Sequence, residues 1–173
     1  MGQRVWVEGW GFDKRRCGQD VHEVKRIAIA GGTGFIGSEL ARALVARGDQ
    51  VLVFTRNVKK GHRGLPREVE LCEWDPRQDG AWQERLDGTD AVVQLAGEVL
   101  VGRRYTKALK DEFYASRVTS TECLVRGIER ATRKPSVFVS GSAIGYYGCD
   151  RGATPLDEKS GAGEDFLAKL CVD

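Results

Sequence analysis

The chain has 173 residues, with 27 Lys and Arg against 25 Asp and Glu, and a formal net charge of +2 at pH 7. This length suits one domain with its own hydrophobic core, and the balanced charge argues against nucleic acid or an anionic membrane as a partner. No apolar stretch is long enough to cross a bilayer. The five cysteines are odd in number and form no C-x-x-C pair, so we expect reduced thiols in a cytoplasmic protein and no metal site.

Residues 1–24 differ in character from the rest of the chain. Val5-Trp6-Val7 is a short apolar piece, but Gly-rich and charged sequence follows it directly. We expect a poorly ordered N-terminal extension here, and an organellar location if these residues belong to a targeting segment.

From Lys25 onward, short apolar runs alternate with helical patterns, which is typical of a parallel sheet wrapped by helices. The expected strands are 26–30, 50–55, 68–73, 91–95 and 136–140. The expected helices are 35–47 and one long amphipathic segment, 106–132, with a weak turn at 82–86, a polar loop around 59–63 and a further helix beginning just before residue 173. The predicted fold class is therefore α/β: a Rossmann-like, doubly wound parallel sheet, incomplete, with about five strands.

The junction between the first strand and the first helix carries a dinucleotide-binding pattern. Gly32, Gly34 and Gly37 satisfy G-x-G-x-x-G, and Gly31 adds the variant G-x-x-G-x-x-G. The first two glycines allow a tight turn, Gly34 lacks the Cβ that would keep a diphosphate off the backbone, and Gly37 lets the helix approach the sheet. The free N–H groups and dipole of the helix then hold the phosphates. The predicted cofactor-binding residues of this loop are Gly31, Gly32, Thr33, Gly34, Phe35, Ile36 and Gly37.

The end of the second strand indicates which nucleotide binds. An NAD site usually has an acidic residue about twenty residues past the glycines, which accepts a hydrogen bond from the ribose 2′-OH. Here Thr55 and Arg56 stand at that place instead. A guanidinium can hold a 2′-phosphate, which a carboxylate would repel, so we favour NADP over NAD and assign both residues to the site. Lys59 or Lys60 could share the task, and Arg56 could equally be an exposed loop residue.

Asp75 follows the third strand, beside Trp74. In this geometry Asp75 is placed to contact the adenine, and the alternative is a Trp-Asp-Pro turn with a purely structural role.

Together, the strand and helix pattern and the glycine loop predict that residues 25–173 form an NADP-binding Rossmann domain, with the C-terminal part and the substrate domain missing.

Further motifs give the chain a family resemblance. They are Ala30–Gly37, Leu95–Glu98, Arg103–Thr106, Ser116–Thr121 and Ser140–Gly148. With them, residues 25–173 resemble the short-chain dehydrogenase/reductase superfamily, in its extended, epimerase/dehydratase-like branch. More narrowly, the chain is similar to the atypical "epimerase family" proteins that carry an uncharacterised C-terminal domain.

The resemblance implies roles for two of these segments. Leu95, Ala96, Gly97 and Glu98 are implied to run beside the ribose and nicotinamide of the cofactor, where small side chains leave room for the sugar. Ser142 matches the serine that in active relatives hydrogen-bonds a substrate carbonyl or hydroxyl, although an ST-turn would explain it as well.

The chain departs from the family at the residues that transfer protons. Active relatives use a Tyr-x-x-x-Lys pair, but no tyrosine here has a lysine four residues later, and the matching segment is Asp165–Cys171. Arg117 fills the position of the family's asparagine. Tyr146 and Tyr147 are the predicted catalytic substitutes beside Ser142, with loop packing as their alternative.

Charged residues after the fourth strand supply a second set of candidates. Glu98 could act as an acid or base, and Arg103 and Arg104 could hold an anionic substrate, with helix capping or solvation as the alternatives. Two functions follow: an NADP-dependent oxidoreductase or epimerase acting on a small anionic or sugar-like substrate, or a catalytically inactive NADP(H)-binding regulator or sensor. We also expect an exposed strand edge, and we expect the 106–132 segment to be the surface of any homo-oligomer.

Overall fold

A computed structural model of the chain describes residues 23–61, 63–100, 102–149, 151–153 and 155–173. The expectation of a poorly ordered extension over residues 1–24 concerns residues 1–22, which lie outside the described part of the chain. His62, in the predicted polar loop, lies outside it as well.

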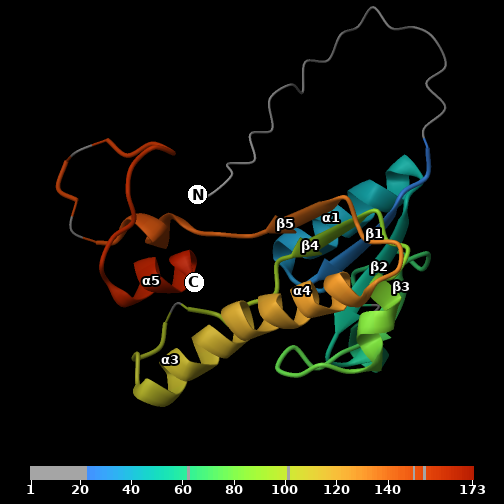
Figure 1. Cartoon of the computed structure of the whole chain (residues 1–173), viewed down its shortest axis with the longest axis horizontal. Helices are drawn as coiled ribbons and strands as arrows, with labels where there is room; N and C mark the ends of the chain where they lie inside the picture. The colour runs from blue at the N-terminus through green and yellow to red at the C-terminus, as the bar shows by residue number, and fades with distance from the viewer. Residues whose placement is uncertain (1–22, 62, 101, 150, 154) are drawn as a thin grey trace, which may run out of the picture.

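Five parallel strands form one sheet (Figure 1). They are β1 (Arg26–Ala30), β2 (Gln50–Thr55), β3 (Glu70–Glu73), β4 (Ala91–Gln94) and β5 (Val137–Ser140), in the order β3-β2-β1-β4-β5. In this register Ile29 lies between Val53 of β2 and Val93 of β4. The strand order reverses beside β1, so the carboxyl ends of β1 and β4 flank the switch point where such sheets bind ligands. The predicted α/β, Rossmann-like class with about five strands is confirmed.

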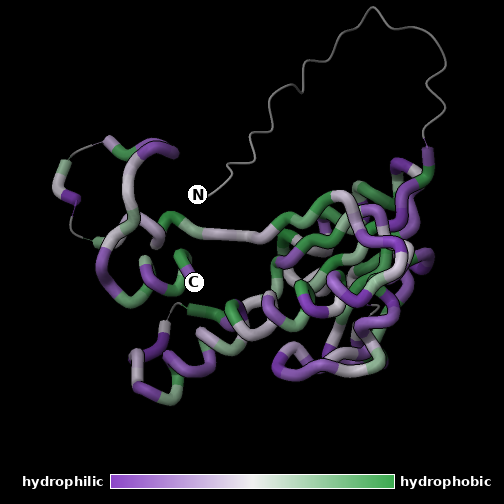
Figure 2. The backbone as a smooth tube through the Cα atoms, viewed as in Figure 1, coloured by the Kyte–Doolittle hydropathy of each residue, from purple (hydrophilic) through white to green (hydrophobic). Residues whose placement is uncertain are grey.

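Alternate residues of the strands pack against different layers, as the two-residue period of a strand requires. Ile27 and Ile29 of β1 face α1 (Phe35–Arg47), together with Ala41 and Leu44 of that helix. Ala28 and Ala30 face the opposite side, covered by the 3₁₀ turn η1 (Ala81–Leu86) and α4 (Ser120–Arg130). Apart from β3, whose ends are Glu70 and Glu73, the strands are accordingly among the more hydrophobic stretches of the chain (Figure 2).

Apart from one-residue shifts at element ends, the structure differs from the sequence expectation in three places. The long amphipathic segment is three pieces: α3 (Lys107–Tyr114), a π-helical turn η2 (Ala115–Thr119) and α4. The polar loop contains a single helical turn, α2 (Val58–Gly61). β3 begins at Glu70, two residues later than predicted, because the Val69 N–H closes a turn onto the Pro66 carbonyl at 3.3 Å instead of joining the sheet.

The last part of the chain packs beside α3 (Figure 1). It contains η3 (Ile144–Tyr147) and α5 (Phe166–Val172), whose first turn is capped by Asp165, which accepts a hydrogen bond from the Ala168 N–H at 2.9 Å. Leu170 of α5 is buried against Phe113 of α3.

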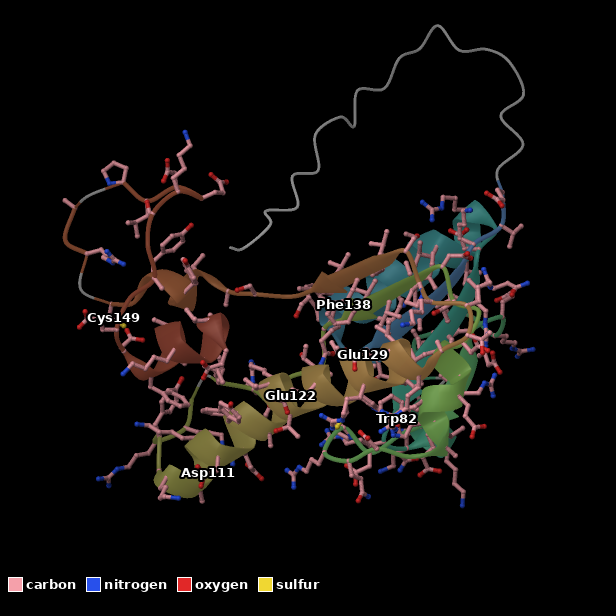
Figure 3. All side chains as sticks on the ribbon, in the orientation of Figure 1. Trp82, Asp111, Glu122, Glu129, Phe138 and Cys149 are labelled. Atoms are coloured by element: carbon pink, nitrogen blue, oxygen red, sulfur yellow. The ribbon has the colours of Figure 1, made fainter. Side chains whose placement is uncertain are left out.

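The β5 edge of the sheet is exposed. Val137, Phe138 and Val139 are 49%, 37% and 47% accessible, and Figure 3 labels Phe138 on this edge strand. The expectation of an exposed strand edge is thus confirmed. Among the described residues, every helix falls short of the length and apolar character that a bilayer crossing requires.

Candidate functional site

The glycine loop is pressed against the chain that leaves β4. Gly31 has a φ of +82°, and a Cβ placed on it would lie 2.6 Å from both the Ala96 nitrogen and the Leu95 carbonyl carbon. A Cβ on Gly37 would lie 2.7 Å from the Gly32 Cα and would collide with the Gly31 carbonyl oxygen. Only glycine fits these two positions, because the obstructing atoms are backbone and cannot move aside cheaply.

The first turn of α1 is open toward this loop. Gly34 is the residue before the helix, and no side chain among the described residues caps it. The first turn carries no acidic residue, and the side chains of Phe35 and Ile36 are 90% and 67% exposed. Unused backbone N–H groups at a helix N-terminus bind anions. A Cβ on Gly34 would approach only the Gly31 oxygen, at 3.2 Å, so the space beside this position is not filled by protein.

A cavity of about 420 Å³ adjoins the loop. Its lining comes from the glycine loop (Gly31, Thr33 and Gly34), the end of β2 and the turn after it (Phe54–Asn57, Lys60 and Gly61), Trp74 and Pro76, and the segment after β4 (Leu95–Glu98 and Ser116). Arg56 and Lys60 supply positive charge to it, and both are exposed. Within the described residues neither forms an ion pair, so both cations are available to a ligand in the cavity.

Two predicted residues beside this cavity have structural tasks. Thr55 is buried, and its hydroxyl accepts a hydrogen bond from the Asn57 N–H at 3.2 Å. The Asp75 carboxylate accepts from the Arg77 N–H and from the Gln78 amide, both at 2.9 Å. Asp75 is exposed and does not line the cavity, although its neighbours Trp74 and Pro76 do. The hydrogen bonds favour the structural-turn alternative for Asp75, and its contact with adenine stays a prediction.

Side chains of β4 and of the π turn η2 form hydrogen bonds with the backbone of residues 95–98. The side-chain oxygen of buried Gln94 accepts from the Ala96 N–H at 3.0 Å, and its amide nitrogen donates to the Ser120 hydroxyl at 2.7 Å. On the far side, the Ser116 hydroxyl accepts from the Glu98 N–H at 3.0 Å, and the Arg117 guanidinium donates to the Glu98 carbonyl at 2.9 Å. The π turn η2 therefore fixes the backbone that faces the glycine loop.

A second cavity of about 850 Å³ joins this loop to the C-terminal part of the chain. Its lining includes Gly34, Gly97, Arg117, Ser142 and residues 170–173 of the last helix and chain end. The predicted loop residues Phe35, Ile36 and Gly37 line it too. The structure thus brings Ser142 into the same cavity as the open end of α1, and its contact with a substrate stays a prediction.

Comparison with known proteins shows the family to which the chain belongs. A model of the NAD dependent epimerase/dehydratase family matches residues 27–168. The chain belongs to this family. Over 147 residues it is 38% identical to an epimerase family protein of Mycobacterium leprae. The aligned region covers 85% of this chain and 45% of that protein. The predicted resemblance is confirmed.

Solved structures agree. The structure of human epimerase family protein SDR39U1 (isoform 2) with NADPH matches with a TM-score of 0.68 and 30% identity, over 85% of this chain and 46% of that one. A nucleoside-diphosphate sugar epimerase from Corynebacterium glutamicum matches with a TM-score of 0.69 and 31% identity, over 87% of this chain and 29% of that one. This family member therefore spans less than half the length of these relatives.

The two tyrosines predicted as catalytic lie apart from the cavities. Among the described residues, neither Tyr146 nor Tyr147 contributes to either lining. The Tyr147 hydroxyl donates to the Asp157 carbonyl at 2.9 Å, and the two rings pack edge to face with centroids 5.3 Å apart. These contacts favour the loop-packing alternative, and the catalytic roles stay predictions. In the segment that replaces the family's Tyr-x-x-x-Lys pair, Phe166 packs against Tyr105, with ring centroids 6.2 Å apart.

Arg117 has a position that sequence reasoning did not foresee. Arg103 and Arg104, the predicted anion-binding residues, do not line either cavity in the described structure, and Arg103 lies 3.7 Å from the Glu98 carboxylate. Arg117 does line the larger one. Burial lowers the pKa of its guanidinium, while Cys171, Glu98 and Tyr105 nearby act in the opposite direction. The Ser116–Thr121 motif was the available signal, but it does not reveal which way the side chain faces.

The described part of the chain contains no group of three or more His, Cys, Asp or Glu side chains that could hold a metal ion.

Proposed function

We propose that this chain is the NADP-binding part of an NADP-dependent oxidoreductase or epimerase that acts on a small substrate. The observation that carries the proposal is the uncapped start of α1 at Gly34, which opens on the same cavity as Arg56 and Lys60. Backbone N–H groups suit a diphosphate, and two cations beyond the neighbouring strand suit an additional phosphate.

The preference for NADP over NAD rests on the end of β2. An exposed Arg56 follows Thr55 there, at the position where an acidic residue would accept a bond from a free ribose 2′-OH. Lys60, one helical turn further on, adds a second positive charge to the same cavity. The solved human relative contains NADPH, which supports the same choice.

The residues of the chain would hold such a cofactor in three places. The N–H groups after Gly34 bind the diphosphate, and Arg56 and Lys60 bind the 2′-phosphate. The small residue Ala96 lets the nicotinamide ribose approach the backbone, whereas the Arg117 guanidinium fills the space over Gly97. The bound nicotinamide supplies hydride transfer. Ser142, in the larger cavity, donates a hydrogen bond to a substrate carbonyl or hydroxyl.

A second candidate is a catalytically inactive NADP(H)-binding regulator. It is favoured by the missing Tyr-x-x-x-Lys pair and by the Tyr147 hydroxyl, which is already bonded to the Asp157 carbonyl. A chain that binds NADP(H) without moving a proton would need only the glycine loop and the cations beside it.

Turnover separates the two candidates. The protein is mixed with NADPH and a panel of aldehydes, ketones and nucleotide sugars, and NADPH absorbance is followed. Oxidoreductase function predicts consumption that falls at least about tenfold in Ser142→Ala, since one hydrogen bond at the reacting oxygen is lost, and that is unchanged in Ser136→Ala. Consumption that survives Ser142→Ala contradicts the assigned site. An epimerase returns the hydride to its substrate and consumes no NADPH, so the sugar products are also analysed for inversion. A protein that binds NADPH but shows neither consumption nor an inverted product supports the regulator.

A further inference from the structure

The π turn η2 presents two adjacent side chains to one neighbouring segment. In a regular α-helix, residues one apart point about 100° away from each other. Here Ser116 accepts from the Glu98 N–H and Arg117 donates to the Glu98 carbonyl, so both side chains reach the same residue. π turns of this kind occur often at functional sites. The turn places the Arg117 guanidinium over Gly97, where a Cβ would lie 2.9 Å from its central carbon.

Most N–H donors of the Arg117 guanidinium have no hydrogen-bond partner among the described residues. It donates to the Glu98 carbonyl at 2.9 Å and to the Ser116 hydroxyl at 3.2 Å. Arginine has five N–H donors, so the other three have no acceptor among the described residues. Arg117 forms no ion pair there either: the nearby Glu98 carboxylate lies 3.7 Å from Arg103 instead. Arg117 is therefore a half-buried cation that lacks a counter-charge in contact with it.

The cavity around Arg117 is otherwise almost uncharged. Among the described lining residues, Arg117 and the last residue, Asp173, carry the side-chain charges. The other lining residues are apolar, as at Leu100 and Leu167, or carry uncharged polar groups: the hydroxyls of Tyr105, Thr121, Ser140 and Ser142, the Gln94 amide and the Cys171 thiol. A cation in surroundings of this kind interacts more strongly with an anion than an exposed arginine does, because less water screens the pair.

We propose that Arg117 is the anion-recognition residue of the larger cavity and binds a carboxylate or phosphate group of the substrate beside the bound dinucleotide. This inference rests on the proposed function, which assigns the glycine loop to the cofactor. It replaces Arg103 and Arg104 as the anion-binding residues and narrows the substrate class to small carbonyl or hydroxyl compounds that carry a negative charge. Ser142 then contacts the reacting oxygen while Arg117 holds the charged group.

The test uses inorganic phosphate as the probe. The full chain is saturated with NADPH, so that the glycine loop is filled, and phosphate is titrated by calorimetry. Arg117→Gln is expected to raise the phosphate dissociation constant at least about tenfold, as the loss of a charge-assisted pair requires, while NADPH affinity changes less than about threefold. Arg117→Lys keeps the charge and is expected to retain most phosphate binding. Arg103→Gln is the matched control and should bind phosphate like the wild type.

The outcomes separate this inference from the proposed function. Equal phosphate affinity in the wild type and Arg117→Gln, with NADPH bound, overturns the inference alone. A parallel loss of NADPH affinity in Arg117→Gln, with an unchanged melting temperature, assigns the guanidinium to the cofactor diphosphate and also overturns it. If the wild type binds no NADPH, the proposed function fails. Phosphate titration of the unliganded proteins then still decides whether Arg117 binds an anion.

Discussion

The pair Gly34→Ala and Gly37→Ala separates cofactor binding from loop packing. Both substitutions add one methyl group to the same glycine loop. At Gly34 the backbone is extended, with φ −81° and ψ 178°, which alanine adopts freely, and the new Cβ would meet only the Gly31 oxygen, at 3.2 Å. At Gly37 the Cβ would lie 2.7 Å from the Gly32 Cα. The first variant should be about as stable as the wild type, and the second should be clearly less stable.

The magnitudes follow from these contacts. Overpacking against rigid backbone at Gly37 costs about 1–3 kcal/mol, and each kcal/mol lowers the melting temperature of a chain of this size by about 2–4 °C. At Gly34 the poorer helix cap and the lower backbone entropy of the unfolded chain nearly cancel, so stability changes by less than about 1 kcal/mol. A methyl group there would hold the diphosphate away from the N–H groups of α1. Losing one charge-assisted hydrogen bond of about 1.5–3 kcal/mol raises the NADPH dissociation constant about ten- to hundredfold.

Two measurements on each variant test this reasoning. Thermal unfolding reports stability, and calorimetric titration with NADPH reports affinity. We expect Gly34→Ala to melt like the wild type and to bind NADPH at least about tenfold more weakly. A Gly34→Ala protein that melts normally and binds NADPH as tightly as the wild type would refute the assignment of the diphosphate to this loop.

Three further variants probe the surroundings of the site. Arg56→Asp should weaken NADPH binding at least about tenfold while leaving NADH binding nearly unchanged, and calorimetry showing equal losses would remove the argument for 2′-phosphate selection. Gln94→Leu leaves the Ala96 N–H without its acceptor, so chemical denaturation should show a loss of about 1–3 kcal/mol, and an unchanged stability would show that this bond is dispensable. A hydrogen bond from the Arg26 N–H lowers the pKa of the Asp90 carboxyl, and the Arg133 guanidinium lowers it further. The ionised carboxylate therefore stabilises the fold fully above its unfolded-state pKa. This stabilisation is lost as the pH falls through the folded-state pKa. Asp90→Asn should therefore melt lower than the wild type at neutral pH, and the two proteins should converge as the pH falls through the lowered folded-state pKa. An equal gap at neutral and at strongly acidic pH would contradict this.

Sequence reasoning predicted the elements and the glycine loop because their signals are local. The apolar run 26–30, the glycines after it and the helix that follows lie within about twenty residues of each other, and each has one physical interpretation. The five strands and α1 consequently lie where they were expected, apart from small shifts at strand ends such as the late start of β3.

The side-chain arrangement around the 95–98 segment depends on contacts that sequence patterns do not contain. Gln94 reaches Ser120, 26 residues away, and Arg117 reaches Glu98, 19 residues away. The π turn that positions Arg117 has no separate sequence signal, because the amphipathic pattern over 106–132 predicts one continuous helix. Arg103 and Arg104 are predicted to bind an anion because they closely follow a strand end, but within the described part of the chain neither residue lines either cavity.

For Asp75, Tyr146 and Tyr147, the sequence pattern alone does not distinguish a functional role from a structural one. Each belongs to a motif that agrees with a functional or a structural role, and the contacts of the folded chain favour the structural role, while the functional roles stay predictions. The Asp75 carboxylate accepts from the Arg77 N–H, and the Tyr147 hydroxyl donates to the Asp157 carbonyl.

The central claim is that the loop between Gly31 and Gly37 and the cations after β2 bind a phosphorylated dinucleotide. Calorimetric titration of the wild-type chain with NADPH and, separately, with NADH tests it most directly. We expect NADPH to bind at one site, at least about tenfold more tightly than NADH. Absence of heat with both coenzymes would contradict the claim, and tighter binding of NADH would contradict the role of Arg56.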